Sequence, residues 1–383
     1  MKVAVGMITR SLDGMITEFL DNADEFGHRI DGIIATYSHG DDGAAVAQIG
    51  DRVPFFPIDL HNIAFCREEL KRRGMPSSAA DTLLNCRFIG DVGLVPYGFN
   101  RNAVLMETIL RGFDILVFID TDVYPSILLN KDGVVASEVV DFFGTHIKYL
   151  ESGSDITTSE YSGYNILPPC GFDGMEDLLM GVQKADMLEY WQSCGAHQCL
   201  ALQPDDDTPA PASKVLGGNV AFRMSIFGDF PPFFSSFYES GGEFFLARGE
   251  DTLMGPAIRQ KGIVCTDVRM YILHDTYKNY PAVPDIKNSP ADQLRFYYAI
   301  TGWCGRNPLF NHFLGNDTGA VREYQRKHLT AGVEALAEYT GNPLYLTVMS
   351  RFESSWDNLP GYLDEHDKYM EAWYEFIKRS DLG

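Results

Sequence analysis

The residues of this chain that most clearly suggest chemistry are two aspartates, Asp120 and Asp122, in the string LVFIDTDVYP. They follow the apolar run Ile115–Ile119, which is typical of a strand covered on both faces. Open α/β sheets bind ligands outside the carboxyl ends of their strands. Carboxylates two residues apart in extended backbone point the same way and can share a hard divalent cation. The alternative is that Asp120 caps a turn and Asp122 is solvated.

Two later segments carry further candidates. Gly217 and Gly218 either let the backbone pass close to a ligand or form an ordinary tight turn. Glu250 and Asp251 either face the cleft as a base or acceptor ligand, or serve the backbone alone. In the second case Asp251 caps a helix that we expect over 252–260.

A histidine completes the set of polar residues at strand ends. His274 closes the apolar run Val268–Leu273. A lone histidine at such a place is usually structural, but neutral imidazole is also a good ligand for divalent metals. We therefore expect His274 to join Asp120 and Asp122 in a metal site.

Strand-like and helix-like patterns alternate over the first 120 residues. They cover 3–8, 15–26, 30–37, 100–112 and 115–119 in turn. This alternation predicts an α/β sheet with substantial parallel pairing. From Pro290 the patterns become helical, over 293–303, 320–339, 343–352 and 362–379. We expect two domains, 1–287 and 288–383, and a mobile loop over 203–214.

Composition narrows the class of protein. The chain has 383 residues, of which 45% are apolar, so disorder of the whole chain is excluded. Lys and Arg total 31 against 53 Asp and Glu, and this net charge of −22 argues against nucleic acid or anionic lipid as main partner. No apolar run approaches 18 residues, so no transmembrane helix is expected. The start of the chain lacks a signal-peptide pattern, so we expect a cytoplasmic protein.

The number and spacing of the cysteines also favour a cytoplasmic location. Seven cysteines at irregular spacing indicate reduced thiols rather than a disulfide framework. Cys194, His197 and Cys199 lie close enough to suggest a metal. No second cluster at a recognised spacing accompanies them, so we do not expect a zinc site.

Taken together, these motifs resemble those of nucleotide-sugar-dependent glycosyltransferases of the GT-A fold. The shared order is a helix opening with Arg101-Asn102, a strand ending in D-x-D, a Gly-Gly segment, a Gly-Glu-Asp segment and a distal histidine. The Gly-Glu-Asp segment is similar to that of family 2, and the order with a helical tail also resembles the mannosylglycerate synthase family. Arg10 stands where many family 2 members have a Pro-rich loop. The absence of a Gln-x-x-Arg-Trp segment argues against a processive polysaccharide synthase.

The resemblance implies a fold and a set of roles. The fold is a Rossmann-like mixed sheet flanked by helices, with a helical C-terminal region. Asp120 and Asp122, with His274, would hold Mn²⁺ or Mg²⁺. The residues implied to line the nucleoside-diphosphate sugar are Thr9, Arg10, Tyr37, Arg101, Asp120, Gly217, Gly218 and Asn219.

The implied reaction is hexosyl transfer from a UDP- or GDP-sugar to a hydroxyl of a small molecule or glycan. Asp251, with Glu250, would face the acceptor hydroxyl. In an inverting enzyme Asp251 would remove the hydroxyl proton, whereas retention needs no dedicated base. The sequence leaves open the donor base, the sugar, the acceptor, the stereochemistry and whether the chain forms a homo-oligomer.

Three other functions share part of this pattern. An apolar run followed by D-x-D also opens phosphatases of the haloacid dehalogenase type, but normally on the first strand, and Tyr124 stands where Thr or Val is expected. A sugar nucleotidyltransferase needs a Gly-rich, Arg-containing loop after the first strand, which Val5–Arg10 does not provide. A non-catalytic protein that binds sugar nucleotides is the third alternative.

Overall fold

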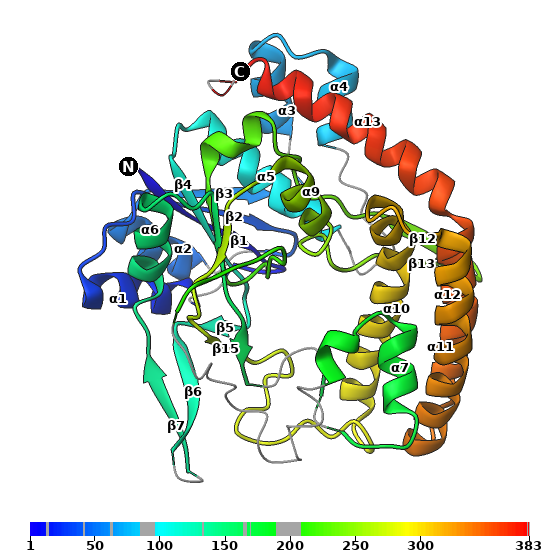
Figure 1. Ribbon diagram of the computed structural model, residues 1–383. Helices are drawn as coiled ribbons and strands as arrows, with labels where there is room; N and C mark the ends of the chain where they lie inside the picture. The colour runs from blue at the N-terminus through cyan, green and yellow to red at the C-terminus, as the bar shows by residue number, and fades with distance from the viewer. Residues whose placement is uncertain are drawn as a thin grey trace.

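The fold is seen in a computed structural model that describes residues 1–12, 15–40, 43–61, 64–84, 96–131, 134–163, 167–168, 170–188, 208–380 and 382. Within these ranges the chain forms a half built on a large sheet and a half built from helices (Figure 1). The large sheet is mixed and eight-stranded, in the order β10-β14-β8-β11-β4-β1-β2-β3. Its strands are β1 (Val3–Ile8), β2 (Gly32–Tyr37), β3 (Phe55–Asp59), β4 (Ile115–Ile119), β8 (Ile156–Thr158), β10 (Ala210–Pro211), β11 (Val220–Arg223) and β14 (Cys265–Asp267).

The parallel pairing predicted from the sequence is confirmed. β1 pairs in parallel with β2 and β4, and β2 with β3, whereas β11 runs antiparallel to both β4 and β8. β3, which contains Pro57, lies at the sheet edge, where a missing N–H donor is tolerated. The sheet half also contains the helices α1 (Ile16–Phe26), α2 (Gly43–Arg52), α3 (Ala64–Arg72), α4 (Ser77–Leu83), α5 (Tyr97–Leu110) and α6 (Phe142–Glu151).

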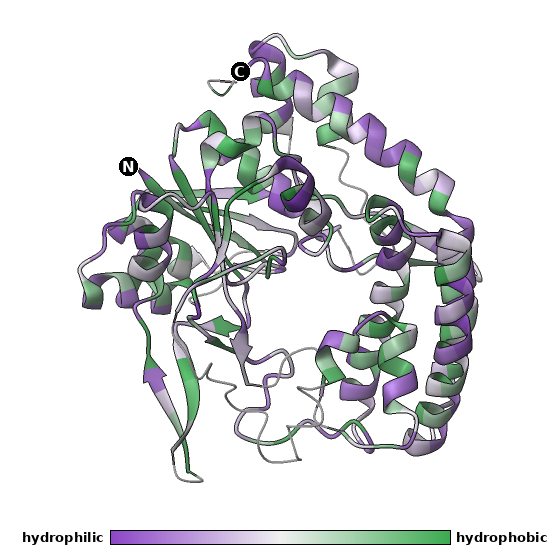
Figure 2. Cartoon of the chain, viewed as in Figure 1, coloured by the Kyte–Doolittle hydropathy of each residue, from purple (hydrophilic) through white to green (hydrophobic). Residues whose placement is uncertain are grey.

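The central strands are continuously apolar because both faces of the sheet are covered. In β4, Leu116 and Phe118 share a core with Val104 of α5. The alternate residues, such as Val117, pack into a second core with Phe19 of α1. Figure 2 shows these strands as mostly hydrophobic. This arrangement leaves the carboxyl ends of the strands as the place where polar side chains gather.

Short strands extend the sheet half near those ends. β5 (Val123–Tyr124), β15 (Ile272–His274) and β9 (Tyr161–Ser162) form a three-stranded sheet. The hairpin of β6 (Ser126–Lys131) and β7 (Val134–Val139) extends away from the body in Figure 1. A second hairpin, β12 (Phe237–Ser240) and β13 (Glu243–Leu246), lies against the helical half.

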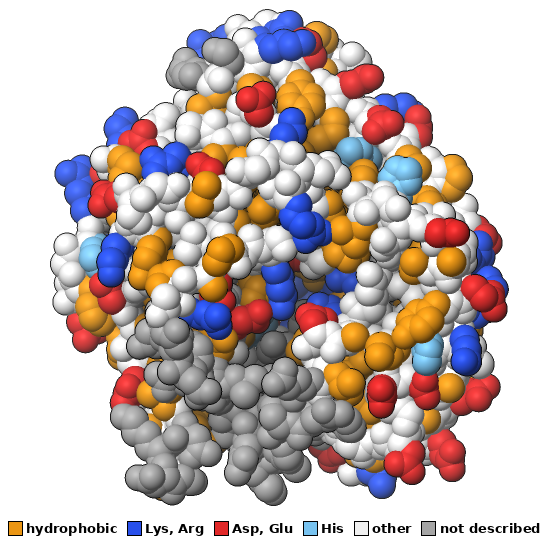
Figure 3. Space-filling model, in the orientation of Figure 1, with side chains coloured by type: hydrophobic (Ala, Val, Ile, Leu, Met, Phe, Trp, Pro, Cys, Tyr) orange, Lys and Arg blue, Asp and Glu red, His pale blue; other side chains and the backbone are white. Residues whose placement is uncertain are grey.

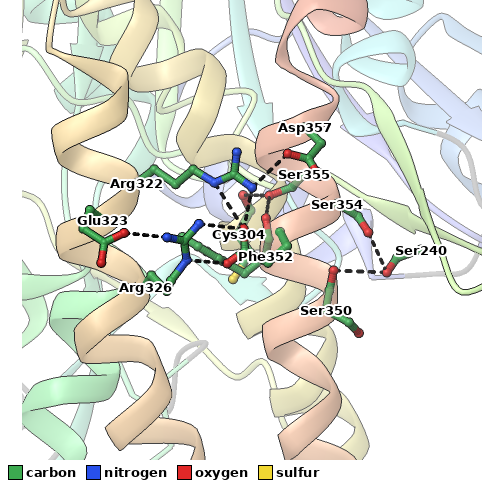
Figure 4. A network of polar contacts seen from close by, with 11 residues as sticks. Ser240, Cys304, Arg322, Glu323, Arg326, Ser350, Phe352, Ser354, Ser355 and Asp357 are labelled. Carbon is green, nitrogen blue, oxygen red and sulfur yellow. Dashed lines mark hydrogen bonds and ion pairs between the residues drawn. The ribbon is translucent and has the colours of Figure 1, made fainter.

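The helical half consists of α7 (Met175–Gly181), α10 (Pro290–Phe313), α11 (Thr318–Thr340), α12 (Val348–Asp357) and α13 (Leu359–Ile377). Ion pairs join α11 to α12: Arg326 Nε lies 2.5 Å from Glu353 Oε1, and Arg322 Nη2 lies 2.8 Å from Asp357 Oδ1 (Figure 4). Among the described residues, the structure contains no helix with the length and apolar character needed to cross a membrane.

The hydrophobic cores of the sheet half and the helical half each include residues from both sides of residue 287. Trp373 and Phe376 of α13 pack in the same core as Phe118 of the large sheet. Conversely, Tyr238 and Phe245 of the β12–β13 hairpin belong to the core of the helical half. The last helix crosses back to α4 of the sheet half (Figure 1), so the C-terminal region holds the two halves together.

Candidate active site

A cavity of about 530 Å³ lies between the ends of the sheet strands and helix α10. Among the described residues its lining includes six acidic and six basic side chains. The acidic residues are Asp120, Asp122, Glu160, Asp186, Glu250 and Asp251, and the basic residues are Arg101, Lys184, Lys214, Arg248, Arg295 and Arg306. Figure 3 shows basic and acidic side chains around this hollowed centre. The lining is therefore charge-balanced, whereas the chain as a whole has a net charge of −22.

Asp120 and Asp122 lie just after β4, and both line the cavity. The antiparallel pairing of β15 with β5 places His274 opposite Val123. His274 Nε2 consequently lies 3.8 Å from Asp122 Oδ1. The other ring nitrogen, Nδ1, lies 2.9 Å from the Thr276 hydroxyl, a contact that orients the ring.

The predicted metal site consists of Asp120, Asp122 and His274, and the structure brings only two of these side chains face to face. Among the described residues, no three His, Cys, Asp or Glu side chains come together as a metal-binding group. Asp122 and His274 face each other, but Asp120 Oδ1 accepts a hydrogen bond from Arg101 instead. Mg²⁺ is commonly held by one or two carboxylates together with substrate phosphates and water. The Asp122–His274 pair therefore fits a cation shared with a bound diphosphate.

Arg101 of α5 joins the separate motifs. Its side chain is buried, and it donates through Nε to Glu250 (2.9 Å), through Nη1 to the Gly217 carbonyl (2.9 Å) and through Nη2 to Asp120 (2.8 Å). Burial opposes the charged guanidinium, but Asp120 and Glu250 outweigh it and raise the pKa of Arg101. Arg101 thus fixes the D-x-D, Gly-Gly and Gly-Glu-Asp segments relative to one another.

Gly217 and Gly218 lie directly against the ion pair of Arg101 with Asp120. A side chain at Gly217 would overlap the Arg101 guanidinium, and a Cβ at Gly218 would lie 2.8 Å from Asp120 Oδ2. The Gly218 N–H donates to the hydroxyl of Tyr161 at 2.9 Å. The close approach predicted at these positions is therefore to the Arg101–Asp120 pair.

Asp251 lines the cavity but does not cap a helix. Helix α9 (Met254–Lys261) begins three residues later, which places Pro256 in its first turn, where proline is tolerated. The predicted cap is therefore wrong. Instead, Asp251 Oδ2 accepts from the Gly217 N–H at 3.1 Å, and Oδ1 accepts from the Thr252 N–H at 2.6 Å.

Glu250 differs from its neighbour in its surroundings. It is buried, and its carboxylate is bound to Arg101. Burial, followed by the charge of Asp251, raises the pKa of Glu250. Of the two acids, Asp251 is the one whose hydrogen bonds come from backbone N–H groups rather than from a buried cation.

The prediction for Asn219 is wrong, because its side chain points away from the cavity. Its amide nitrogen donates to the carbonyls of Glu160 (3.1 Å) and Met270 (3.0 Å), and its Oδ1 lies 3.0 Å from His146 Nε2. Successive residues entering β11 point to opposite faces of the sheet. Since Gly218 faces Asp120, Asn219 falls on the other face, where it is fully buried.

Thr9, Arg10 and Tyr37, which the resemblance places at the nucleoside, lie at the carboxyl ends of β1 and β2. They are not among the described residues that line the cavity. Arg10 is exposed, and its guanidinium lies 3.4 Å from His39 Nε2. Ile8, which directly precedes Thr9, does line the cavity.

The structure adds residues that the sequence analysis missed. They are Tyr161, Lys184, Lys214, Arg248, Arg295, Trp303 and Arg306, all in the cavity lining. Arg295 Nη2 lies 3.5 Å from Asp122 Oδ2, so it lies next to the predicted metal pair. The Lys214 ammonium is 3.0 Å from Glu160. Burial lowers the pKa of Lys214, but the charges of Glu160 and Asp186 outweigh burial, so the pKa is raised.

Some predictions fall outside the described residues. They are Cys194, His197 and Cys199, which suggested a metal, and residues 203–207 of the predicted loop.

Comparison with known proteins gives distant structural similarity only. No family model and no curated protein matches this chain. It is similar to glucosyl-3-phosphoglycerate synthase from Mycobacterium tuberculosis in complex with Mn²⁺, UDP and phosphoglyceric acid, with 14% identity, 82% of this chain and 79% of that chain covered, and a TM-score of 0.39. For the complex with Mg²⁺ and UDP the identity is 15%, the coverage 82% and 80%, and the TM-score 0.40. A likeness this distant assigns no activity to this chain.

Proposed function

We propose that this chain is a metal-dependent glycosyltransferase that moves a hexosyl group from a UDP- or GDP-sugar to an acceptor hydroxyl. The observation that carries the proposal is the arrangement of acidic groups in one cavity. Asp122 and His274 face each other at the strand ends, and Asp251 lines the same cavity. Arg101 holds these two parts together through Asp120 and Glu250.

The cation subsite acts on the leaving group. Asp122 and His274 would hold Mn²⁺ or Mg²⁺, which, when bound, stabilises the negative charge that builds on the departing diphosphate. Arg295, beside Asp122, adds a positive charge on the same side. Asp120 keeps its place through Arg101 and leaves Oδ2 facing Gly218.

Asp251 acts on the acceptor. For an inverting transfer, its carboxylate removes the proton of the attacking hydroxyl, while the N–H groups of Gly217 and Thr252 hold it in place. For a retaining transfer, the leaving phosphate takes the proton and Asp251 orients the acceptor. The anomeric configuration of the product distinguishes the two.

The nucleoside would lie over the ends of β1 and β2, against Thr9, Arg10 and Tyr37. These residues supply a hydroxyl, a cation and an aromatic ring beside the cavity. A cytoplasmic location stays a prediction from the sequence.

Calorimetric titration of UDP, GDP and their hexose conjugates, with and without Mn²⁺, tests the proposal. We expect one nucleotide family to bind, and to bind tightly only with the metal. Release of nucleoside diphosphate when acceptors are added would then demonstrate transfer. No nucleotide binding under any condition would overturn the proposal, and a trapped aspartyl phosphate would indicate the phosphatase alternative.

A further inference from the structure

The cavity wall opposite the strand ends contains a buried arginine without a charged partner. Arg306 of α10 is 3% exposed and lines the cavity. Its Nε and Nη2 both donate to Asn307 Oδ1, at 3.2 and 2.7 Å. Among the described residues, no ion pair joins it to a carboxylate. Burial lowers the pKa of Arg306 to about 10, against the opposing effect of the more distant charges of Asp251 and Asp186. A buried cation is normally paired, because losing water is costly.

A network of neutral amides holds this arginine in place. Asn307 Nδ2 lies 3.5 Å from Gln325 Oε1, and Gln325 Nε2 donates to Gln183 Oε1 at 2.9 Å. Asn311 Nδ2 donates to the same Gln183 oxygen at 2.7 Å. Asn307, Asn311 and Gln325 are each no more than 2% exposed. The network therefore orients the guanidinium but leaves its charge uncompensated.

The same network places a second cation at the cavity. Gln183, with a φ of 57°, directly precedes Lys184, so fixing Gln183 fixes the backbone of Lys184. The Lys184 ammonium lies 5.5 Å from the centroid of the Trp303 ring, one helical turn before Arg306 on α10. Within the described ranges, Lys184 has no ion pair either. Burial lowers the pKa of Lys184 to about 8, and the charge of Arg306 adds to this effect.

Arg306 is also close to the proposed acceptor side of the site. A Cβ at Gly249 would lie 2.8 Å from Arg306 Cδ, so the arginine stem packs against the Gly-Glu-Asp backbone. Asp251 follows two residues later and, with Asp186, is one of the two carboxylates whose charge reaches Arg306. A group bound by Arg306 would consequently lie near Asp251.

We propose that Arg306 and Lys184 form a second anion subsite, which binds a carboxylate or phosphate group of a substrate and is separate from the diphosphate subsite at Asp122 and His274. The proposal rests on the proposed function for the identity of the first subsite. Arginine binds such groups through two parallel hydrogen bonds, and the amide network keeps it pre-oriented for them. Asn307 is a positioning residue: it holds Arg306 without neutralising it.

Binding of sulfate to protein already saturated with Mg²⁺ and the preferred nucleoside diphosphate tests this subsite. Two variants remove it in different ways. Arg306→Met deletes the charge, and Asn307→Asp keeps Arg306 but gives it an internal counterion. Arg326→Met is the matched control, because Arg326 belongs to the same helical half but is paired with Glu353 outside the cavity.

We expect one sulfate to bind the wild type and Arg326→Met equally, and at least about tenfold more weakly to Arg306→Met and Asn307→Asp. All four proteins should bind the Mg²⁺–nucleotide alike. Loss of sulfate binding in Asn307→Asp with unchanged thermal stability separates a charge effect from misfolding. Equal sulfate binding by the wild type and both cavity variants would overturn the subsite. Failure of nucleotide binding in the wild type would instead overturn the proposed function.

Competition then identifies the source of the anion. If sulfate weakens the binding of UDP-glucuronate but not UDP-glucose, the bound group is the carboxylate of the donor sugar. If sulfate affects neither, the group belongs to the acceptor, and Arg306 orients that acceptor toward Asp251.

Discussion

The cavity has a sheet wall, which includes Arg101, Asp120 and Glu250, and a helical wall, which includes Arg306 of α10. The two walls differ in how a buried arginine is paired. On the sheet wall, the buried Arg101 is bound by two carboxylates, Asp120 and Glu250. On the helical wall, the buried Arg306 donates its hydrogen bonds to the neutral amide of Asn307 and lies over the Phe310 ring, without an ion pair among the described residues. A compensated arginine serves to hold structure together, whereas an uncompensated one remains available to an anionic ligand. This difference is the basis for the proposal that Arg101 positions the site and that Arg306 binds an anion.

The strongest test of the sheet wall concerns its reacting carboxylate. Asp251→Asn should lower the rate of transfer, and for an inverting transfer the loss should be about 10²–10⁴-fold, the usual contribution of a general base. Nucleotide binding should be unchanged, because Asp251 does not contact the Asp122–His274 pair. Asp364→Asn, an exposed aspartate on α13, serves as control. A fully active Asp251→Asn enzyme would reduce Asp251 to a backbone hydrogen-bond acceptor.

Stability measurements compare the two arginines directly. Arg101→Met leaves Asp120 and Glu250 without their cation and should lower the free energy of unfolding by about 3–5 kcal/mol. Arg306→Met removes a charge that has no ion pair in the part of the chain that the structure describes, so stability should be unchanged or higher. Urea denaturation of both variants measures the difference. An equal loss of unfolding free energy in the two variants would show that Arg306 is compensated as fully as Arg101.

The cation pair should control nucleotide affinity rather than stability. Asp122→Ala should weaken nucleotide binding in Mn²⁺ by about 100-fold, equivalent to ~2.7 kcal/mol, as expected when a metal ligand is lost. His274→Ala should act in the same direction. The wild type in a chelator should then behave like Asp122→Ala in Mn²⁺. Unchanged affinity in both variants would remove the metal assignment.

The smallest effect concerns pH and the helical wall. Because burial lowers the pKa of Lys184 to about 8, Lys184 loses its proton as the pH rises through 8. The groups whose charges act on it are Arg306, Lys214, Asp186 and Asp251. Sulfate keeps its charge in this range, so its affinity should fall about tenfold between pH 7 and 9.

Lys184→Met isolates that titration. In this variant sulfate affinity should already be low at pH 7 and should not change up to pH 9. A wild type whose sulfate affinity is flat over the same range would exclude Lys184 from the subsite.

The sheet wall was largely predictable from sequence, because its elements show local patterns. Continuous apolar runs mark the buried strands, and polar residues directly after them mark the ligand-binding edge. Asp120 and Asp122 indeed follow β4, and the pairing of β15 with β5 brings His274 beside Asp122. The error at Asn219 arose from the residue-by-residue alternation of side chains near a strand, which a glycine-rich segment does not reveal.

The helical wall was not predictable in this way. α10 has buried polar side chains, such as Thr301 and Asn311, on several of its faces, so no helical period separates its core from its surface. Arg306 is oriented by Asn307, and Asn307 is in turn held by a network that includes Gln325 of α11 and Gln183, which follows α7 and is far away in the sequence. Likewise, Arg101 was expected near the ligand, and only the fold shows that it connects three motifs.

The most direct test of this account is a crystal structure with Mn²⁺ and the preferred nucleoside diphosphate, measured at the manganese absorption edge. We expect one strong anomalous peak between Asp122 and His274, about 2.0–2.3 Å from a ligand atom of each, with the diphosphate on its cavity side. Manganese bound elsewhere, or a diphosphate held by Arg306 and Lys184 instead, would contradict the proposal that the sheet wall binds the donor and the helical wall binds a second anion.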